Sequence, residues 1–202
     1  MRLYQSPASP FARKVRVVVR EAGLADRVEE VLATGTAVVP GSMPVDRNPL
    51  GKIPTLERED GPALYDSRVI CRYLDALAGS GLYPEPPRLW DTLTLEATGD
   101  GIAEAALLMV YEGRIRPEPM QYGPWVEAQW DKVARALDAL EDRWIAHLAG
   151  PLDIGQIAVA TALGYLDFRH ADRAWREGRP QLAAWEARMA ARPSLVATRP
   201  VA

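Results

Sequence analysis

The alternation of apolar and polar positions in the N-terminal residues predicts a strand, a helix and a second strand. The apolar pair at 3–4 indicates a short first strand. A helix follows, because Ser9 and Pro10 are preferred at the first helical positions and Gly23 just past a helix end. Apolar side chains between them recur at helical spacing: Phe11, Val15, Val18, Val19 and Ala22. Residues 28–32 predict the second strand, which a right-handed crossover would place parallel to the first.

The next part of the chain predicts a loop, a hairpin and a helix. Residues 33–47 combine weak periodicity with glycine and proline, so we expect a mobile loop or a poor short helix. Pro54 opens a short apolar strand, and an Asp-Gly pair suits the hairpin turn to a second strand at 63–65. From Asp66, which suits a helix N-cap, the apolar period becomes helical. Its predicted buried stripe is Val69, Ile70, Tyr73, Leu74 and Leu77.

Residues 78–87 are rich in glycine and proline, and we interpret them as a linker between two domains. The preceding domain, 1–77, has the order strand, helix, strand, loop or helix, two strands and helix. The following domain, 88–202, has helical periodicity throughout. The expected fold class is therefore an α/β domain followed by an all-α domain.

Four helices are expected in the second domain. The first, 89–111, has small apolar residues in its second half, as in a helix packed closely on others. The second carries a regular apolar seam of Trp130, Val133, Leu137, Leu140 and Trp144. Asp153 begins the third, and with Gln156 it forms a capping box that satisfies two backbone N–H groups reciprocally. The fourth covers 181–191 and ends at an Arg-Pro pair.

Composition excludes several classes of function. A net charge of −3 and an isoelectric point near 5.5 give no general attraction to nucleic acid. Cys71, the one cysteine, falls among apolar positions and is expected to be a core residue. His147 and His170 have no carboxylate or cysteine at ligand spacing, so we expect no metal site. No apolar stretch suits a signal peptide or a membrane span, and a cytoplasmic protein is expected.

Residues 48–68 carry the candidate binding chemistry. The start of the helix after Asp66 offers free backbone N–H groups and the Ser67 hydroxyl, and these donors favour a carboxylate ligand. If the Ile53–Pro54 bond is cis, the Ile53 amide turns out of the sheet and can pair with an extended peptide. The alternative is a hairpin of the same fold that binds no ligand.

The motif Asn-Pro-Leu-Gly-Lys-Ile-Pro-Thr-Leu, followed by Asp-Ser, resembles the glutathione-binding half of cytosolic glutathione transferases. The resemblance implies a thioredoxin-like first domain, an all-helical second domain and glutathione as co-substrate. It assigns Ile53 and Pro54 to the cysteinyl backbone of glutathione, and Asp66 and Ser67 to its γ-glutamyl end. It also adds two residues to the binding set: Phe11 and Lys52.

The motif Ser-Pro-Ala-Ser-Pro-Phe resembles bacterial transferases of the serine type, in which a serine at the start of the first helix faces the glutathione sulfur. The resemblance assigns Ser9 as the catalytic and sulfur-contacting residue. Ser6, which also precedes a proline, and Tyr4 in the first strand remain alternatives. A cap role for Ser9 is compatible with catalysis, because the hydroxyl keeps its own proton to donate. Serine in place of cysteine disfavours thiol exchange.

The activity implied is attack of glutathione thiolate on a hydrophobic electrophile, as in detoxification. The alternative is a non-catalytic adaptor of the same fold. Four residues of the helical domain could line an electrophile pocket, although core packing accounts for them equally well: Tyr111, Arg114, Tyr165 and Phe168. The resemblance further implies a homodimer that closes through the long apolar helix, with Asp100 reaching the partner's glutathione.

Overall fold

The computed structural model describes residues 1–201, which divide into two compact units. The first unit is Met1–Leu89 together with the chain from Pro193 onward, and the second is Trp90–Arg192. The sequence analysis had assigned everything after residue 87 to the helical domain. The C-terminal segment instead packs on the first unit, where the Arg13 guanidinium donates to the Leu195 carbonyl over 3.1 Å.

The first unit contains a mixed four-stranded sheet with the strand order β2-β1-β3-β4. Its strands are β1 (Arg2–Gln5), β2 (Glu29–Leu32), β3 (Thr55–Arg58) and β4 (Gly61–Leu64). β1 pairs parallel with β2 and antiparallel with β3, and β3 pairs antiparallel with β4. The predicted order of elements and the parallel crossover are confirmed. Residues 33–54 form neither helix nor strand, so the loop interpretation of 33–47 holds and a helix there is wrong.

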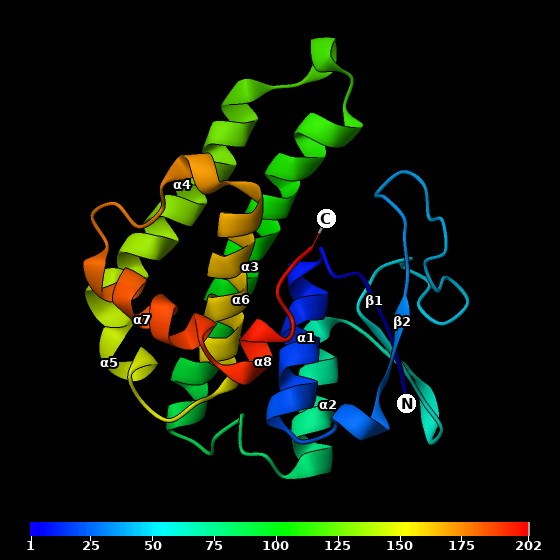
Figure 1. Cartoon of the computed structure of the whole chain (residues 1–202). Coiled ribbons are helices and arrows are strands. Elements are labelled where there is room, and N and C mark those ends of the chain that lie inside the picture. The colour runs from blue at the N-terminus through cyan, green and yellow to red at the C-terminus, as the bar shows by residue number, and fades with distance from the viewer. Residues whose placement is uncertain (202) are drawn as a thin grey trace. The chain divides into compact units, whose positions relative to one another are not determined.

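Helices α1 (Pro10–Glu21) and α2 (Ser67–Ala78) pack against each other beside this sheet (Figure 1). Both begin where the sequence predicted. The Ser9 hydroxyl accepts from the Ala12 N–H over 3.2 Å, and the Asp66 carboxylate accepts from the Arg68 N–H over 3.0 Å. α2 ends at Gly79, whose φ of 63° is a left-handed conformation that favours glycine.

The buried stripe of α2 is narrower than predicted. Ile70 and Leu74 are fully buried, but Val69 and Leu77 are exposed by 48% and 38%. Cys71 is buried beside them, which confirms it as a core residue. Ile70, Cys71 and Leu74 form the buried side of α2, and Val69 and Leu77 lie at the margins of that side.

A short helix connects α1 to β2, and another lies in the C-terminal segment: η1 (Ala25–Arg27) and α8 (Pro193–Val196). The sequence analysis missed α8, because four residues are too few to show a helical period. Within residues 1–201, three peptide bonds are cis: Ile53–Pro54, Tyr65–Asp66 and Pro86–Pro87. The first of these agrees with the expectation from the sequence.

The second unit is built from helices in each of the four predicted regions. They are α3 (Arg88–Ile115), η2 (Glu118–Met120), α4 (Gly123–Ala139), the π-helical turn η3 (Leu140–Trp144), α5 (Ile145–Leu148), α6 (Ile154–Arg169), η4 (Ala171–Arg173) and α7 (Pro180–Ala190). The predicted apolar seam spans α4 and η3, and its three central aliphatic residues are fully buried. Among the described residues, no helix is both long enough and apolar enough to cross a membrane.

Helices α3 and α6 approach each other closely at Gly99. A Cβ atom at Gly99 would lie 2.5 Å from the carbonyl carbon of Ala158 on α6, closer than real Cβ contacts. The two backbones therefore approach to a separation that only glycine permits. Farther along, the buried His170 ring lies with its Nε2 2.9 Å from the Ala106 carbonyl of α3. The His170 ring is therefore satisfied by the backbone inside the second unit.

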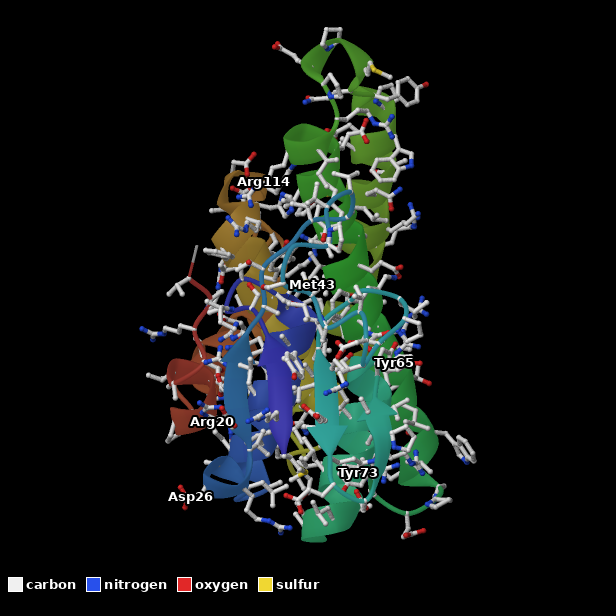
Figure 2. The ribbon with its side chains drawn as sticks, turned by 90° about the vertical axis from the view of Figure 1, so that its right-hand side faces the viewer. Arg20, Asp26, Met43, Tyr65, Tyr73 and Arg114 are labelled. Carbon is white, nitrogen blue, oxygen red and sulfur yellow. The ribbon has the colours of Figure 1, made fainter. Side chains whose placement is uncertain are left out.

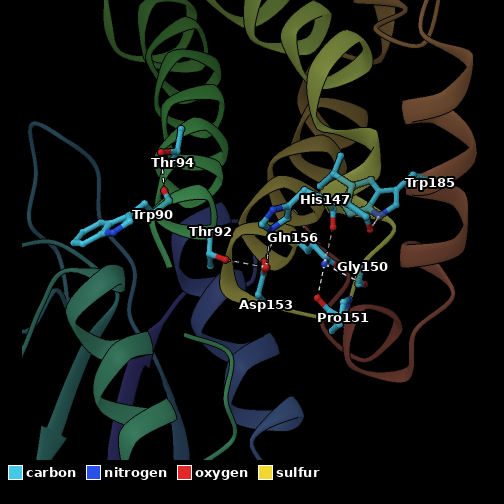
Figure 3. Close-up of polar contacts among 10 residues, drawn as sticks. Trp90, Thr92, Thr94, His147, Gly150, Pro151, Asp153, Gln156 and Trp185 are labelled. Atoms are coloured by element: carbon cyan, nitrogen blue, oxygen red, sulfur yellow. Dashed lines mark hydrogen bonds and ion pairs between the residues drawn. The ribbon is translucent and has the colours of Figure 1, made fainter. Parts of the chain in front are cut away.

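Asp153 caps α6 and also joins three segments of the second unit (Figure 3). One carboxylate oxygen accepts from the Gln156 N–H over 3.1 Å, as the capping box predicted. The other accepts from the Thr92 hydroxyl over 3.0 Å and lies 2.8 Å from His147 Nε2. His147 therefore has a carboxylate partner six residues later, which the search for metal-ligand spacing did not reveal. The Gln156 amide donates to preceding carbonyls, the shortest bond being 2.7 Å to Pro151.

Candidate functional site

The candidate residues of the first unit come from three chain segments that meet at one edge of the sheet. β1 runs antiparallel to β3, and β3 antiparallel to β4, so the ends of β1 and β4 lie beside the start of β3. Figure 2 shows Tyr65, just after β4, and Met43 toward one end of the sheet, and Asp26, which precedes β2, toward the other. The edge that includes Tyr65 therefore carries Ser9 after β1, Pro54 before β3 and Asp66 after β4.

Both twelve-residue helices present their N-termini at this edge. The first N–H groups of a helix lack intrahelical partners and carry a partial positive charge, so they favour a bound anion. Ser9 is partly exposed and uses its oxygen as the cap acceptor for Ala12, which leaves its proton available. Phe11, two residues after Ser9 in the first turn of α1, is partly buried.

The two alternatives to Ser9 have different surroundings. Ser6 precedes the helix, and its carbonyl accepts from the Ser9 N–H over 3.0 Å. Tyr4 points its hydroxyl to Glu57 on β3, with a donor-to-acceptor distance of 3.1 Å. Burial and this bond to Glu57 raise the pKa of Tyr4. The Tyr4 proton is therefore committed within the sheet, which weakens its case as a donor to a ligand.

Ser67 supplies a hydroxyl donor without an internal partner. The residue is 3% exposed, yet its hydroxyl forms no hydrogen bond with any other described residue. The hydroxyl is not among the buried side-chain groups that lack a partner, so the small exposed part of Ser67 includes it and a ligand oxygen can reach it. The neighbouring Asp66 is exposed and keeps one carboxylate oxygen beyond its cap bond.

The segment before β3 leaves backbone groups unpaired. Neither the N–H nor the carbonyl of Ile53 forms a hydrogen bond within the described chain. Pro54 is buried, whereas Ile53 is partly exposed and the Lys52 side chain projects into solvent. An extended peptide could pair with such a segment in the manner of an added strand.

Asn48, the first residue of the quoted motif, organises this segment, and the sequence had given it no role of its own. Its side-chain N–H₂ group donates to the Lys52 carbonyl over 2.9 Å and to the Thr55 hydroxyl over 3.2 Å. Its side-chain oxygen accepts from the Leu50 N–H over 3.0 Å. The residue is 1% exposed. A single side chain therefore ties together both ends of the loop that contains Ile53.

We expect Asn48→Ala to lower the free energy of unfolding by about 2–3 kcal/mol, because three buried hydrogen bonds are lost and their partners are left unsatisfied. Urea denaturation followed by circular dichroism measures this change. The matched control is Asp46→Ala in the same loop, where the carboxylate is exposed and the expected change is below about 0.5 kcal/mol. Equal losses in the two variants would contradict the organising role of Asn48.

The remaining candidates lie in the second unit. Tyr111 and Arg114 are on the last part of α3, and Tyr165 and Phe168 are on the last part of α6. Asp100, proposed from the resemblance to reach a partner's ligand, is buried within α3 in the single chain. Among the described residues, no group of three or more histidine, cysteine, aspartate and glutamate side chains is placed to hold a metal ion.

The mixed sheet with its paired helices, followed by an all-helical unit, defines a thioredoxin-like domain joined to a helical domain. Two family models match the chain in this order. One is described as glutathione S-transferase, N-terminal domain, and covers residues 8–77. The other is described as glutathione S-transferase, C-terminal domain, and covers residues 123–188.

Relatives extend these matches over the whole chain. The uncharacterized GST-like protein YibF of Escherichia coli (strain K12) is 31% identical over 99% of this chain and 98% of its own. A glutathione transferase family member from Pseudomonas fluorescens Pf-5, solved with bound glutathione, is 46% identical with a TM-score of 0.96, covering 100% of this chain and 99% of its own. A glutathione S-transferase from Methylobacillus flagellatus KT, also with glutathione bound, is 38% identical with a TM-score of 0.86 over 99% of each chain. The chain belongs to the glutathione S-transferase family.

Proposed function

We propose that the protein is a glutathione transferase that conjugates glutathione thiolate to hydrophobic electrophiles. The observation that carries the proposal is the gathering of unpaired donors at one sheet edge: two helix N-termini, the Ser67 hydroxyl and the Ile53 backbone. Two relatives of 46% and 38% identity that were solved with glutathione bound support it.

In this proposal each candidate residue has a distinct role toward glutathione. The Ile53 backbone, presented before the buried Pro54, pairs with the cysteinyl part of the tripeptide. The start of α2, with Asp66 and Ser67, receives the γ-glutamyl end, where the N–H groups and hydroxyl suit the carboxylate and Asp66 suits the ammonium. Two further residues contribute to the binding surface: Phe11 and Lys52.

Ser9 has the catalytic role in this proposal, through the serine-type arrangement at the start of α1. Its hydroxyl donates to the glutathione sulfur, and the helix dipole favours the same negative charge. The thiol loses its proton to solvent, and the thiolate then attacks the electrophilic carbon of the second substrate. An adaptor protein of the same fold would have no use for this set of unpaired donors, and we therefore favour the enzyme.

The double variant Asp66→Ala/Ser67→Ala is expected to weaken glutathione binding by about ten-fold or more, because it removes a charged partner and a hydroxyl donor. Isothermal titration calorimetry measures the affinity. Ser67→Ala alone is the sharper test, since that hydroxyl is not the cap of α2. Ser42→Ala, in the exposed loop of the same unit, is the control and should bind as the parent does. Unchanged affinity in the double variant would rule out the assigned site.

We further propose a cytoplasmic homodimer that acts in detoxification, as the family resemblance implies. A stable C₂ dimer is expected, with the long helix α3 near the two-fold axis. Light scattering at micromolar concentration measures the mass directly. A monomer under those conditions would exclude both the dimer and the role of Asp100 toward a partner's ligand.

A further inference from the structure

The C-terminal segment belongs to the first unit and packs against α1, the helix that begins after Ser9 (Figure 1). The Arg13 guanidinium donates from Nη2 to the Leu195 carbonyl over 3.1 Å, and the Ser194 hydroxyl donates to the Glu21 carboxylate. Arg13 and Glu21 lie about two helical turns apart on α1. The four-residue helix α8 is therefore bonded to α1 near both of its ends.

The Leu195 carbonyl accepts its hydrogen bond from α1, whereas the other carbonyls of α8 accept from within the C-terminal segment. Those three bonds run to Pro193 from the Ala197 N–H, to Ser194 from the Thr198 hydroxyl and to Val196 from the Arg199 N–H. The last carbonyls of a helix lack intrahelical partners, and an arginine side chain is a favourable donor to them. Because Leu195 is only 2% exposed, the Arg13 guanidinium takes the place that water would have at a helix end in solvent.

Arg13 is also bonded to Ser9 through the first turn of α1. Its backbone N–H donates to the Ser9 carbonyl over 2.9 Å. In the same turn the Ala12 N–H donates to the Ser9 hydroxyl oxygen over 3.2 Å. A single residue therefore connects the C-terminal segment to the residue proposed as the donor to the glutathione sulfur.

The buried Arg13 guanidinium is better explained by geometry than by stability. The residue is 6% exposed, and taking a guanidinium out of water costs free energy that directed hydrogen bonds only offset. An apolar side chain of similar size would fill the same space at lower cost. A guanidinium instead fixes direction, because its donors form a rigid plane. The contact with Leu195 is therefore suited to hold the first turn of α1 in one position.

We propose that Arg13 is a positioning residue for the Ser9 hydroxyl and that the C-terminal segment anchors it. The inference rests on the proposed function, because it explains how the donor to the glutathione sulfur is kept in place. An anchored first turn fixes the direction of the Ser9 hydroxyl, and a hydrogen bond weakens steeply as its angle departs from linear. The proton transfers do not change: the thiol proton passes to solvent, and the Ser9 proton stays on its oxygen.

The pKa of the bound glutathione thiol measures this positioning. A pH titration of the complex with glutathione, followed by the ultraviolet absorbance of the thiolate, gives that pKa. Arg13→Met keeps the apolar stem of the side chain and removes its donors. We expect the thiol pKa to rise by about one unit, which lowers the ionised fraction and kcat near pH 7 by about three-fold. The dissociation constant of glutathione should change by less than about two-fold, since Arg13 is not among the residues proposed to bind the tripeptide.

Two further substitutions on α1 separate positioning from general stability. Arg13→Lys should reverse part of the rise in thiol pKa, since a long cationic donor remains but the planar guanidinium is lost. Arg20→Gln is the matched control, because Arg20 Nη1 donates to the Arg16 carbonyl and to the Glu30 carboxylate rather than to the C-terminal segment. Its thiol pKa should equal that of the parent.

A shortened chain removes the same contact from its other side. A protein that ends at Arg192 lacks the Leu195 carbonyl and should show at least the rise in thiol pKa of Arg13→Met. Adding Arg13→Met to the shortened chain should change the thiol pKa little, because the acceptor is already absent. If the shortened chain does not fold, the two Arg13 substitutions decide the question by themselves.

The parent protein distinguishes failure of the inference from failure of the proposed function. If the thiol pKa is lowered in the parent and Arg13→Met leaves it there while reducing stability, Arg13 is only structural and the inference is overturned. If the parent does not lower the thiol pKa, the proposed function fails, and hydrogen–deuterium exchange of the Ala12 N–H decides whether Arg13 holds the first turn. Exchange about ten-fold faster in Arg13→Met than in Arg20→Gln supports the anchor, and equal exchange overturns it.

Discussion

Ser9→Ala is expected to reduce turnover by about ten- to a hundred-fold while glutathione affinity remains nearly unchanged. A free thiol with a pKa of about 8.5 is only about 3% ionised at pH 7. A thiol whose pKa is lower by about two units is roughly three-quarters ionised, a gain of about 25-fold in nucleophile or about 2.7 kcal/mol. A hydroxyl donor at a helix N-terminus supplies part of that preference for the anion.

The pH dependence of this variant follows from the same argument. Without the Ser9 donor the pKa of the bound thiol rises, so the midpoint of the rate profile moves to higher pH. Parent and variant should then converge at alkaline pH, where both thiols are ionised, and differ most near neutrality. Rates measured across the pH range, with glutathione saturating, show this directly.

Ser6→Ala is the matched control, because it removes a serine hydroxyl from the same loop without touching the cap of α1. It should change turnover much less than Ser9→Ala does. The cap contribution of Ser9 to stability, about 1 kcal/mol, is measured separately by thermal unfolding. If Ser6→Ala carries the loss and Ser9→Ala does not, the catalytic hydroxyl belongs to Ser6.

Local chemistry explains why the helix starts could be predicted from the sequence. Ser9 and Asp66 accept hydrogen bonds from residues two or three positions later, and such caps depend only on neighbours along the chain. The order of elements along the chain followed from the periodicity, and the parallel pairing of β1 with β2 followed from the rule for crossovers. The end of α2 also has a local cause, because Gly79 adopts the left-handed conformation that favours glycine after a helix.

Features that depend on the folded neighbourhood could not be predicted in the same way. Val69 and Leu77 fit the helical period of α2 but lie at the margins of its buried side, and a spacing rule does not locate those margins. The return of the C-terminal segment to the first unit depends on contacts such as that of Arg13 with Leu195, far apart in sequence.

The candidate site shows the same division between local and distant signals. The start of α2, with Ser67, was visible in the motif. The lack of an internal partner for the Ser67 hydroxyl was not, because hydrogen-bond partners are set by tertiary packing. Asn48 could have been found from its position at the start of an Asn-Pro-Leu-Gly turn, since an asparagine side chain there commonly bonds to nearby backbone.

Asp153→Ala is expected to lower the free energy of unfolding by about 3–5 kcal/mol. The carboxylate is 1% exposed and serves three groups: the Gln156 N–H, the Thr92 hydroxyl and the His147 ring. Its removal takes away the cap of α6, worth about 1 kcal/mol, and leaves the Thr92 and His147 groups buried without their partner. Urea denaturation measures the total.

A control and a double-mutant cycle decide whether the loss arises from this network. Asp138→Ala removes an exposed carboxylate that pairs with Arg179 and should cost less than about 1 kcal/mol. Thr92→Val should destabilise the parent by about 1 kcal/mol but add little to Asp153→Ala, because the acceptor is already gone. Full additivity of Thr92→Val and Asp153→Ala would show that the two residues act independently, and the network would then not account for the stability of α6.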